Sequence, residues 1–226
     1  MDARQSDVRR VLYDTLAAEG RAPSVREVAR AAGLTVVDAQ ATLGELAQRH
    51  ALVLTQDGDA VRMAHPFSAA PMGFVVTADS PADDRMWWGG CAWDSFGISA
   101  ALGVDVWIAT SCPGCGARLD YAAGPSLPPT ADLVVHFLVP ARSWWSDVVR
   151  TCSHIRAFCD PTHVDAWCSS TGEPRGEIVA LADVWRLAQP WYGDRLAPDY
   201  APRPVERSQQ LLAAVGLTGE FWQLPG

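Results

Sequence analysis

The sequence contains no lysine, so all 18 of its basic residues are arginine, against 26 aspartate and glutamate residues. We attribute the absence to a GC-rich coding bias, although an arginine-only surface would also suit carboxylate or phosphate partners. The net charge of −8 and the isoelectric point near 5.0 leave no basic excess to displace counterions from a phosphate backbone. Nucleic acid is therefore not an expected partner.

Long apolar runs are missing as well. The first residues lack the uninterrupted apolar segment of a signal peptide, and no stretch of about twenty apolar residues occurs. We therefore expect a cytoplasmic protein with no membrane partner. In such a compartment, six cysteines are expected to be thiols, catalytic groups or metal ligands and not a disulfide framework.

Residues 1–65 predict a helical N-terminal module. Apolar periodicity indicates helices over residues 3–19 and from Val37 to about His50, and the Ser24 to Glu27 capping pattern opens another that ends at Gly33. A hairpin over residues 51–63 follows, completing the order of a winged helix. The predicted third helix carries a single arginine near its end, which favours packing, a lid or a dimer contact over DNA binding.

Residues 66–226 predict a larger module, so the fold class is α+β with mixed or antiparallel strands and flanking helices. Strands are expected over residues 72–77, 86–88 and 133–139, a loop over 124–129, and a short helix or turn over 144–150. The alternation of Cys152, His154 and Arg156 predicts a further strand, before a helix over 161–168.

The first chemical motif is Cys91-Ala-Trp-Asp94, at the start of a largely apolar helical stretch. If Cys91 lies in the first turn, its thiol shares a face with Asp94 and meets the positive end of the helix dipole, which favours the thiolate. The alternative is structural, a buried cysteine beside an aspartate that caps the helix.

The second motif, Cys112-Pro-Gly-Cys115-Gly, is half of a zinc ribbon or a dithiol turn. The other half has four candidate donors, none of which pairs at knuckle spacing: Cys152, His154, Cys159 and His163. We therefore favour a structural turn or a non-catalytic thiol pair over a structural zinc at Cys112 and Cys115.

The third motif, Cys152-Ser-His154, places its thiol and its imidazole on one face of the predicted strand. We interpret His154 as a hydrogen-bonded core histidine in preference to a catalytic one. Cys159 and Cys168 are interpreted as small buried apolar side chains.

Taken in order, Cys91, Asp94, Cys112 and Cys152 resemble the cysteine and aspartate pattern of the organomercurial lyases, also called alkylmercury lyases. The segments that follow Cys152 and Gly176 also look like the C-terminal half of this family. The Pro113-Gly114-Cys115 segment is closer to the wider alkylmercury-lyase-like group.

The resemblance implies a mercury-resistance enzyme that cleaves a carbon–mercury bond by protonolysis. Cys91 and Cys152 would hold the soft metal as thiolates, with Asp94 beside them as a third contact. Asp94 would first help to deprotonate a thiol and then donate the proton to carbon, giving a hydrocarbon and Hg(II). The Hg(II) would pass to cytosolic thiols or a mercuric reductase. No organic cofactor is implied, and no nucleotide-binding fingerprint occurs.

Two other functions remain open at the level of sequence. The same residues could act on a non-mercurial substrate in secondary metabolism, to which an aromatic surround rich in tryptophan is suited. Alternatively, the cysteines could serve as the sensor of a winged-helix regulator that responds to thiols or metals.

Overall fold

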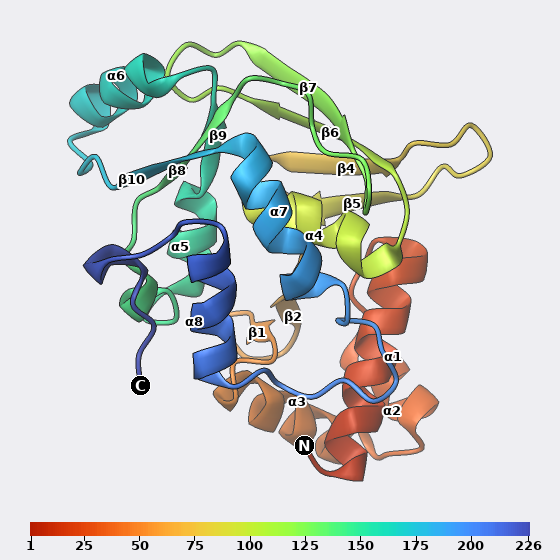
Figure 1. The fold of residues 1–226 in the computed structure, drawn as a ribbon. Helices are drawn as coiled ribbons and strands as arrows, with labels where there is room; N and C mark the ends of the chain where they lie inside the picture. Colours follow the sequence, from red (N-terminus) through yellow and green to blue (C-terminus); the bar gives the residue numbers. More distant parts are fainter.

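The structure, a computed structural model, describes residues 1–226 and contains both helices and antiparallel strands (Figure 1). The helices are α1 (Ala3–Glu19), α2 (Val25–Ala32), α3 (Val36–Gln48), α4 (Ala92–Leu102), α5 (Val148–His154), α6 (Pro161–Thr171), α7 (Leu181–Tyr192) and α8 (Val205–Ala214), with 3-10 turns at Ala141–Ser143 and Glu220–Trp222. The strands are β1 (Val53–Leu54), β2 (Val61–Ala64), β3 (Phe67–Ser68), β4 (Phe74–Ala78), β5 (Met86–Gly89), β6 (Val106–Ser111), β7 (Arg118–Ala123), β8 (Val134–Phe137), β9 (Arg156–Phe158) and β10 (Glu177–Ala180).

The three N-terminal helices begin and end where the sequence signals place them. Ser24 and Glu27 form a reciprocal capping box at the start of α2, which ends at a left-handed Gly33. Thr35 caps α3 by accepting a hydrogen bond from the Asp38 N–H. The three helices are followed by the β1–β2 pair, as expected, while a winged-helix role for this module stays a prediction. No helix in the structure combines the length and the apolar character that a membrane crossing needs.

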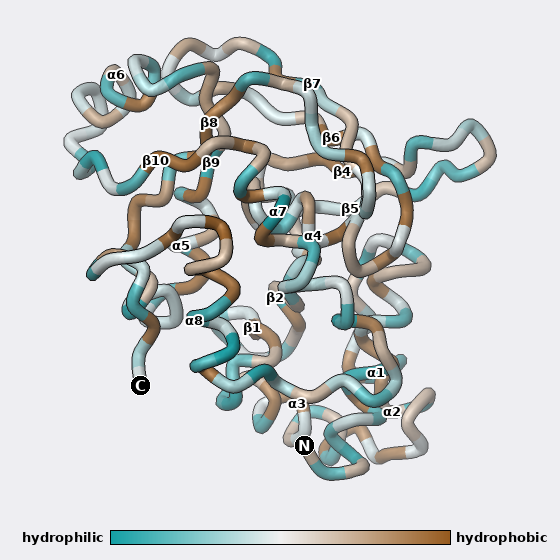
Figure 2. The backbone as a smooth tube through the Cα atoms, viewed as in Figure 1, coloured by the Kyte–Doolittle hydropathy of each residue, from teal (hydrophilic) through white to brown (hydrophobic).

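Two antiparallel sheets form the rest of the framework. The larger has the order β1-β2-β3-β5-β4-β6-β7, and the smaller has the order β10-β8-β9. Figure 2 shows apolar residues along β8, β9 and α7, whereas the loop between β4 and β5 is hydrophilic and extends away from the body of the molecule. The predicted α+β class is confirmed.

Helix α4 lies at the centre of the molecule and packs along α7 (Figure 1). Gly97 of α4 makes this approach possible, because a Cβ at that position would lie 2.4 Å from the ring of Tyr192 on α7. Most of α4 is buried, which explains its nearly continuous apolar sequence.

The N-terminal helices pack directly against the sheet. The indole of Trp87 on β5 donates a hydrogen bond to the Leu16 carbonyl of α1 at 3.0 Å, and the Tyr13 hydroxyl donates to the His65 carbonyl at 3.0 Å. Buried apolar residues of both predicted modules belong to one continuous core. The boundary proposed near residue 66 stays a prediction.

The strand predicted around Cys152 is wrong. Residues 148–154 form helix α5, which Asp147 caps by accepting the Arg150 N–H at 2.9 Å. The strand begins only at Arg156, where β9 pairs with β8. A two-residue alternation over so short a segment does not distinguish a strand from two turns of helix, and the cap decides here.

Candidate active site

Cys91 and Asp94 meet at the start of α4. Cys91 is the N-cap residue, one position before the first turn in which it was expected, and its sulfur accepts the Asp94 N–H at 3.3 Å. Both side chains are 1 % exposed. Gly90 precedes them, and a Cβ there would lie 2.5 Å from Asp94 Oδ2, so the chain can turn so close to the carboxylate only with glycine.

Cys152 reaches the same place from α5. Its sulfur lies 3.3 Å from Nε2 of His65, the residue that follows β2. The same imidazole nitrogen is 4.0 Å from Asp94 Oδ2. Two thiols, one carboxylate and one imidazole therefore converge from three separate segments of the chain.

The two thiols differ in acidity. Burial, contact with Cys152 and the nearby Asp94 raise the pKa of the Cys91 thiol well above its usual value. The pKa of Cys152 is lowered, first by its contact with the Cys91 thiol, against the effect of burial, and then by His65. Burial disfavours a charged His65, but the negative charges of Asp94 and Cys152 outweigh it and raise the pKa of His65 to about 9. Burial and the neighbouring charges thus favour ionisation of Cys152, beside a charged His65, over ionisation of Cys91.

His65 is a site residue that sequence reasoning missed, because His65-Pro66 was interpreted as the start of a connecting segment. A signal was present. Val61 and Met63 are buried on β2, and His65 continues their two-residue alternation toward the interior. Its side chain is only 13 % exposed.

Asp94 has one occupied and one open oxygen. Oδ1 accepts a hydrogen bond from the Tyr192 hydroxyl at 2.7 Å, whereas the buried Oδ2 has no hydrogen-bond partner. A buried carboxylate oxygen without a hydrogen-bond donor lowers the stability of the fold, so such an atom in a native structure calls for an explanation. Oδ2 faces the group formed by His65 and the two thiols, with no other hydrogen-bond donor.

A cavity of about 220 Å³ opens onto these groups. Tryptophan and tyrosine side chains form one wall, in which Trp93 packs against Trp144, Trp191 and Tyr192 with ring centroids 4.7–5.8 Å apart, and two arginines also line the cavity. At the rim, His50 stacks on Trp145 at 4.3 Å and 7° between the ring planes, so the N-terminal module supplies part of the wall. The cavity suits an apolar ligand that carries one soft, thiophilic atom.

The remaining cysteines lie outside this cavity. Cys115 is exposed, and its sulfur is 3.8 Å from that of Cys159. Cys112 is buried at the start of the same turn. Cys159 and Cys168 are only partly buried, so their interpretation as core residues is wrong.

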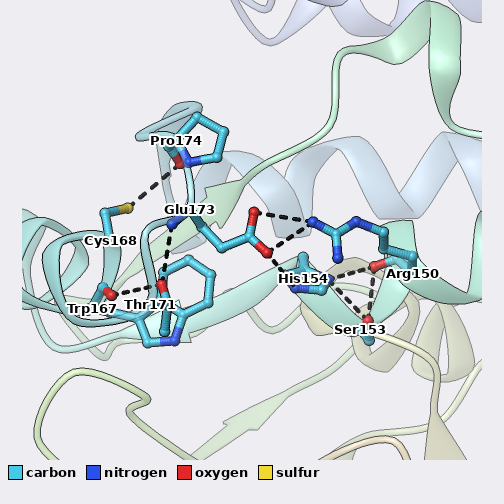
Figure 3. Close-up of polar contacts among 8 residues, drawn as sticks. All are labelled: Arg150, Ser153, His154, Trp167, Cys168, Thr171, Glu173 and Pro174. Carbon is cyan, nitrogen blue, oxygen red and sulfur yellow. Dashed lines mark hydrogen bonds and ion pairs between the residues drawn. The ribbon is translucent and has the colours of Figure 1, made fainter.

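His154 does not line the cavity and instead points toward Glu173 (Figure 3). Its Nδ1 lies 2.8 Å from the Arg150 carbonyl, and its Nε2 is 3.8 Å from a Glu173 oxygen that Arg150 also contacts at 2.8 Å. This network joins α5 to the segment after α6 and so supports the helix that carries Cys152. The structural interpretation of His154 fits this position better than a catalytic one, although it lies near the surface and not in the core.

The fold and the site together define a class of protein, an α+β protein whose pocket holds two thiols, a carboxylate and an imidazole. The family model described as "MerB: Alkylmercury lyase" matches residues 67–193. A solved structure described as "Crystal structure of the mercury-bound form of MerB2" matches with a TM-score of 0.66 and 22 % sequence identity, over 87 % of this chain and 93 % of that chain. A search of curated proteins found no match.

The chain therefore belongs to the alkylmercury lyase family, a family of carbon–mercury lyases. The resemblance drawn from the order of the cysteines is confirmed, and so are the expected fold and the expected class of enzyme. Cys91, Asp94, Cys152 and Tyr192 lie inside the matched segment, whereas His65 lies two residues before it.

Proposed function

We propose that this protein is an organomercurial lyase that converts R–Hg–X and a proton into the hydrocarbon R–H and Hg(II). The observation that carries the proposal is the Cys152 sulfur, held 3.3 Å from Nε2 of His65 in a pocket that also contains a second thiol and an open carboxylate oxygen. The family match supports the class of reaction. No organic cofactor enters the mechanism.

The reaction begins at Cys152. Its thiolate attacks mercury and displaces the ligand X, which gives Cys152–Hg–R. The imidazolium of His65 keeps Cys152 ionised before the attack. Because the attacking group is already a thiolate, this step needs no proton transfer.

The second thiol then joins the metal. Cys91 adds its sulfur to mercury and gives its proton to Oδ2 of Asp94, so that mercury carries two sulfurs and R. The electron density of the two sulfurs weakens the carbon–mercury bond. Asp94 returns the proton to carbon as this bond breaks, and R–H leaves while Hg(II) stays on the two sulfurs. Mercury remains divalent throughout, so no electron donor or acceptor is needed.

Product release follows the same sulfur chemistry. Two external thiols, or the cysteines of a mercuric reductase, exchange onto Hg(II) and lose two protons; one proton returns to the Cys91 sulfur and the other leaves to solvent, so that Cys152 is again a thiolate beside His65. The organic group is accommodated by the aromatic lining. The cavity of about 220 Å³ exceeds the roughly 150 Å³ in which a dry apolar cavity takes up benzene, so an aryl group fits.

The test is hydrocarbon release from the reduced protein. Phenylmercury or methylmercury is incubated with the protein and excess thiol, and benzene or methane is followed by gas chromatography. Cys91→Ser, Cys152→Ser and Asp94→Ala should each abolish release, whereas Cys168→Ser, which changes a thiol outside the cavity, should leave it unchanged.

Full activity in any of the first three variants would remove the role assigned to that residue. Stoichiometric mercury binding without hydrocarbon release would overturn the proposed activity, and would return the site to a non-mercurial substrate or to a sensor.

A further inference from the structure

A second group of metal-binding side chains lies outside the active site. Cys112 and Cys115 belong to the turn between β6 and β7, Cys159 follows β9, and His163 lies in the first turn of α6. The ligand atoms of these four side chains all lie within 4.8 Å of one another. None of the four lines the active-site cavity.

We propose that Cys112, Cys115, Cys159 and His163 bind one structural Zn(II) in a tetrahedral site. Three sulfurs and one imidazole nitrogen are a common ligand set for structural zinc. With zinc–sulfur bonds of about 2.3 Å, the sulfurs of a tetrahedron are about 3.8 Å apart. The separation of 3.8 Å between the sulfurs of Cys115 and Cys159 matches this edge.

The turn that carries Cys112 and Cys115 is shaped to present both sulfurs. The Gly116 N–H bonds to the Cys112 carbonyl at 2.8 Å, and Gly116 has a φ of 75°, a left-handed conformation that glycine adopts without strain. The Cys112 N–H donates to the Ala117 carbonyl at 2.8 Å, so a second backbone hydrogen bond fixes the turn on which both cysteines lie.

Close packing brings this turn to the helix that carries the histidine. A Cβ on Gly114 would lie 2.3 Å from the His163 carbonyl oxygen, so a side chain at this position would push the turn away from α6. The glycine between the two cysteines therefore places their sulfurs beside the first turn of α6.

His163 is oriented for coordination. Its Nδ1 lies 3.0 Å from Oδ2 of Asp160, whose other oxygen caps α6 by accepting the N–H groups of Thr162 and His163. A carboxylate on Nδ1 holds the proton there and leaves the lone pair of Nε2 free for a metal, an arrangement common among zinc-binding histidines. Asp160 thus supports both the helix and its ligand.

A zinc ion here would tie three segments together. It would join the β6–β7 turn and the start of α6 to the end of β9, the strand that follows α5 and Cys152. The larger and the smaller sheet would be linked close to the helix that supplies the attacking thiolate. The expected role is stability and positioning, because no ligand of this site contacts the substrate cavity.

Metal content tests the proposal directly. The full chain, purified under reducing conditions from zinc-supplemented medium without chelator, should contain about one zinc per chain by mass spectrometry of the metal. Cys115→Ser and Cys159→Ser should lose it. Cys91→Ser and Cys168→Ser should keep it, which would place the ion at this cluster and not at the active site.

Asp160→Asn provides a finer test. Asparagine still caps a helix but does not hold the imidazole proton as a carboxylate does, so zinc affinity should fall about 10–100-fold in a chelator competition while the helix is retained. Because the serine variants could misfold, cobalt is also added to the chelated wild-type protein. It should give the absorption of a tetrahedral cobalt–thiolate site, and this absorption should disappear when zinc replaces the cobalt.

The proposal is overturned if the reduced wild-type protein is metal-free and gives no such cobalt spectrum, or if zinc persists in both Cys115→Ser and Cys159→Ser. A Cys115–Cys159 disulfide in the freshly purified protein, found by non-reducing peptide mapping with no zinc present, would also overturn it.

Discussion

Replacing His65 with glutamine removes the positive charge that stabilises the Cys152 thiolate. The pKa of His65 rises from 6.5 to about 9, which corresponds to about 3.4 kcal/mol of net stabilisation of its charged form at 1.36 kcal/mol per pH unit. Burial opposes this shift, so the attractions of Asp94 and Cys152 together exceed it; if Cys152 supplies half, the thiolate loses at least about 1.7 kcal/mol in His65→Gln, because the coupling is reciprocal. The ratio of thiolate to thiol at a given pH then falls at least about 18-fold.

A less acidic thiol is also a better nucleophile. With a Brønsted coefficient near 0.5, about the square root of the loss is recovered, so alkylation of Cys152 should slow about fourfold at pH values where the thiol form predominates in both proteins. At alkaline pH, where both proteins are ionised, the variant should react faster than the wild type. The pH–rate profiles should therefore cross.

The assay measures alkylation of Cys152 by iodoacetamide, which is followed in a tryptic peptide of the protein. Cleavage after Arg150 and Arg156 releases residues 151–156, in which Cys152 is the single cysteine. The control is His50→Asn, which alters another histidine of the same cavity and suits the left-handed φ of 58° at that residue. If the His65→Gln and wild-type profiles coincide over the whole pH range, the ion pair does not exist.

Three further predictions concern the support of the site. Tyr192→Phe removes the hydroxyl that donates to Asp94. The free energy of unfolding should fall by about 2 kcal/mol in urea titrations, and hydrocarbon release should slow. No change in either quantity would refute the role of this hydrogen bond. Gly97→Ala should lower the free energy of unfolding by about 1–3 kcal/mol and displace Tyr192. The control Gly44→Ala, in an open position on α3, should raise it by about 0.5–1 kcal/mol. Equal effects of the two substitutions would contradict the packing argument. Folding raises the pKa of His65 to about 9, so its charged form stabilises the fold fully below pH 6.5 and less as the pH rises to 9. In urea unfolding, the difference in free energy of unfolding between the wild type and His65→Gln should therefore shrink across this pH range.

Local signals predicted the N-terminal helices and the Cys91–Asp94 pair well. Caps and left-handed glycines act within a few residues, so Ser24, Gly33 and the start of α4 can be read from the sequence itself. The order of the cysteines identified the family because several short motifs in a fixed order are more specific together than any one of them alone.

Contacts between distant segments could not be predicted in the same way. His65 and Cys152 are 87 residues apart, and Cys115 and Cys159 are 44 apart. Cys112 and Cys115 were recognised as a pair because they lie on one turn, whereas Cys159 and His163 come near them only through the packing of Gly114 against His163. Spacing rules apply to residues on one turn and do not predict a cluster assembled from three elements.

The stack of His50 on Trp145 places part of the cavity wall on the N-terminal module. The N-terminal module and the connection between α7 and α8 both line the cavity, whereas Cys91, Asp94 and Cys152 lie on elements between them. Under the proposed function, substitutions at His50 or Trp145 should therefore change which organic groups enter more than they change cleavage of the bond. His65, at the end of the same module, is the exception, because it contacts Cys152 itself.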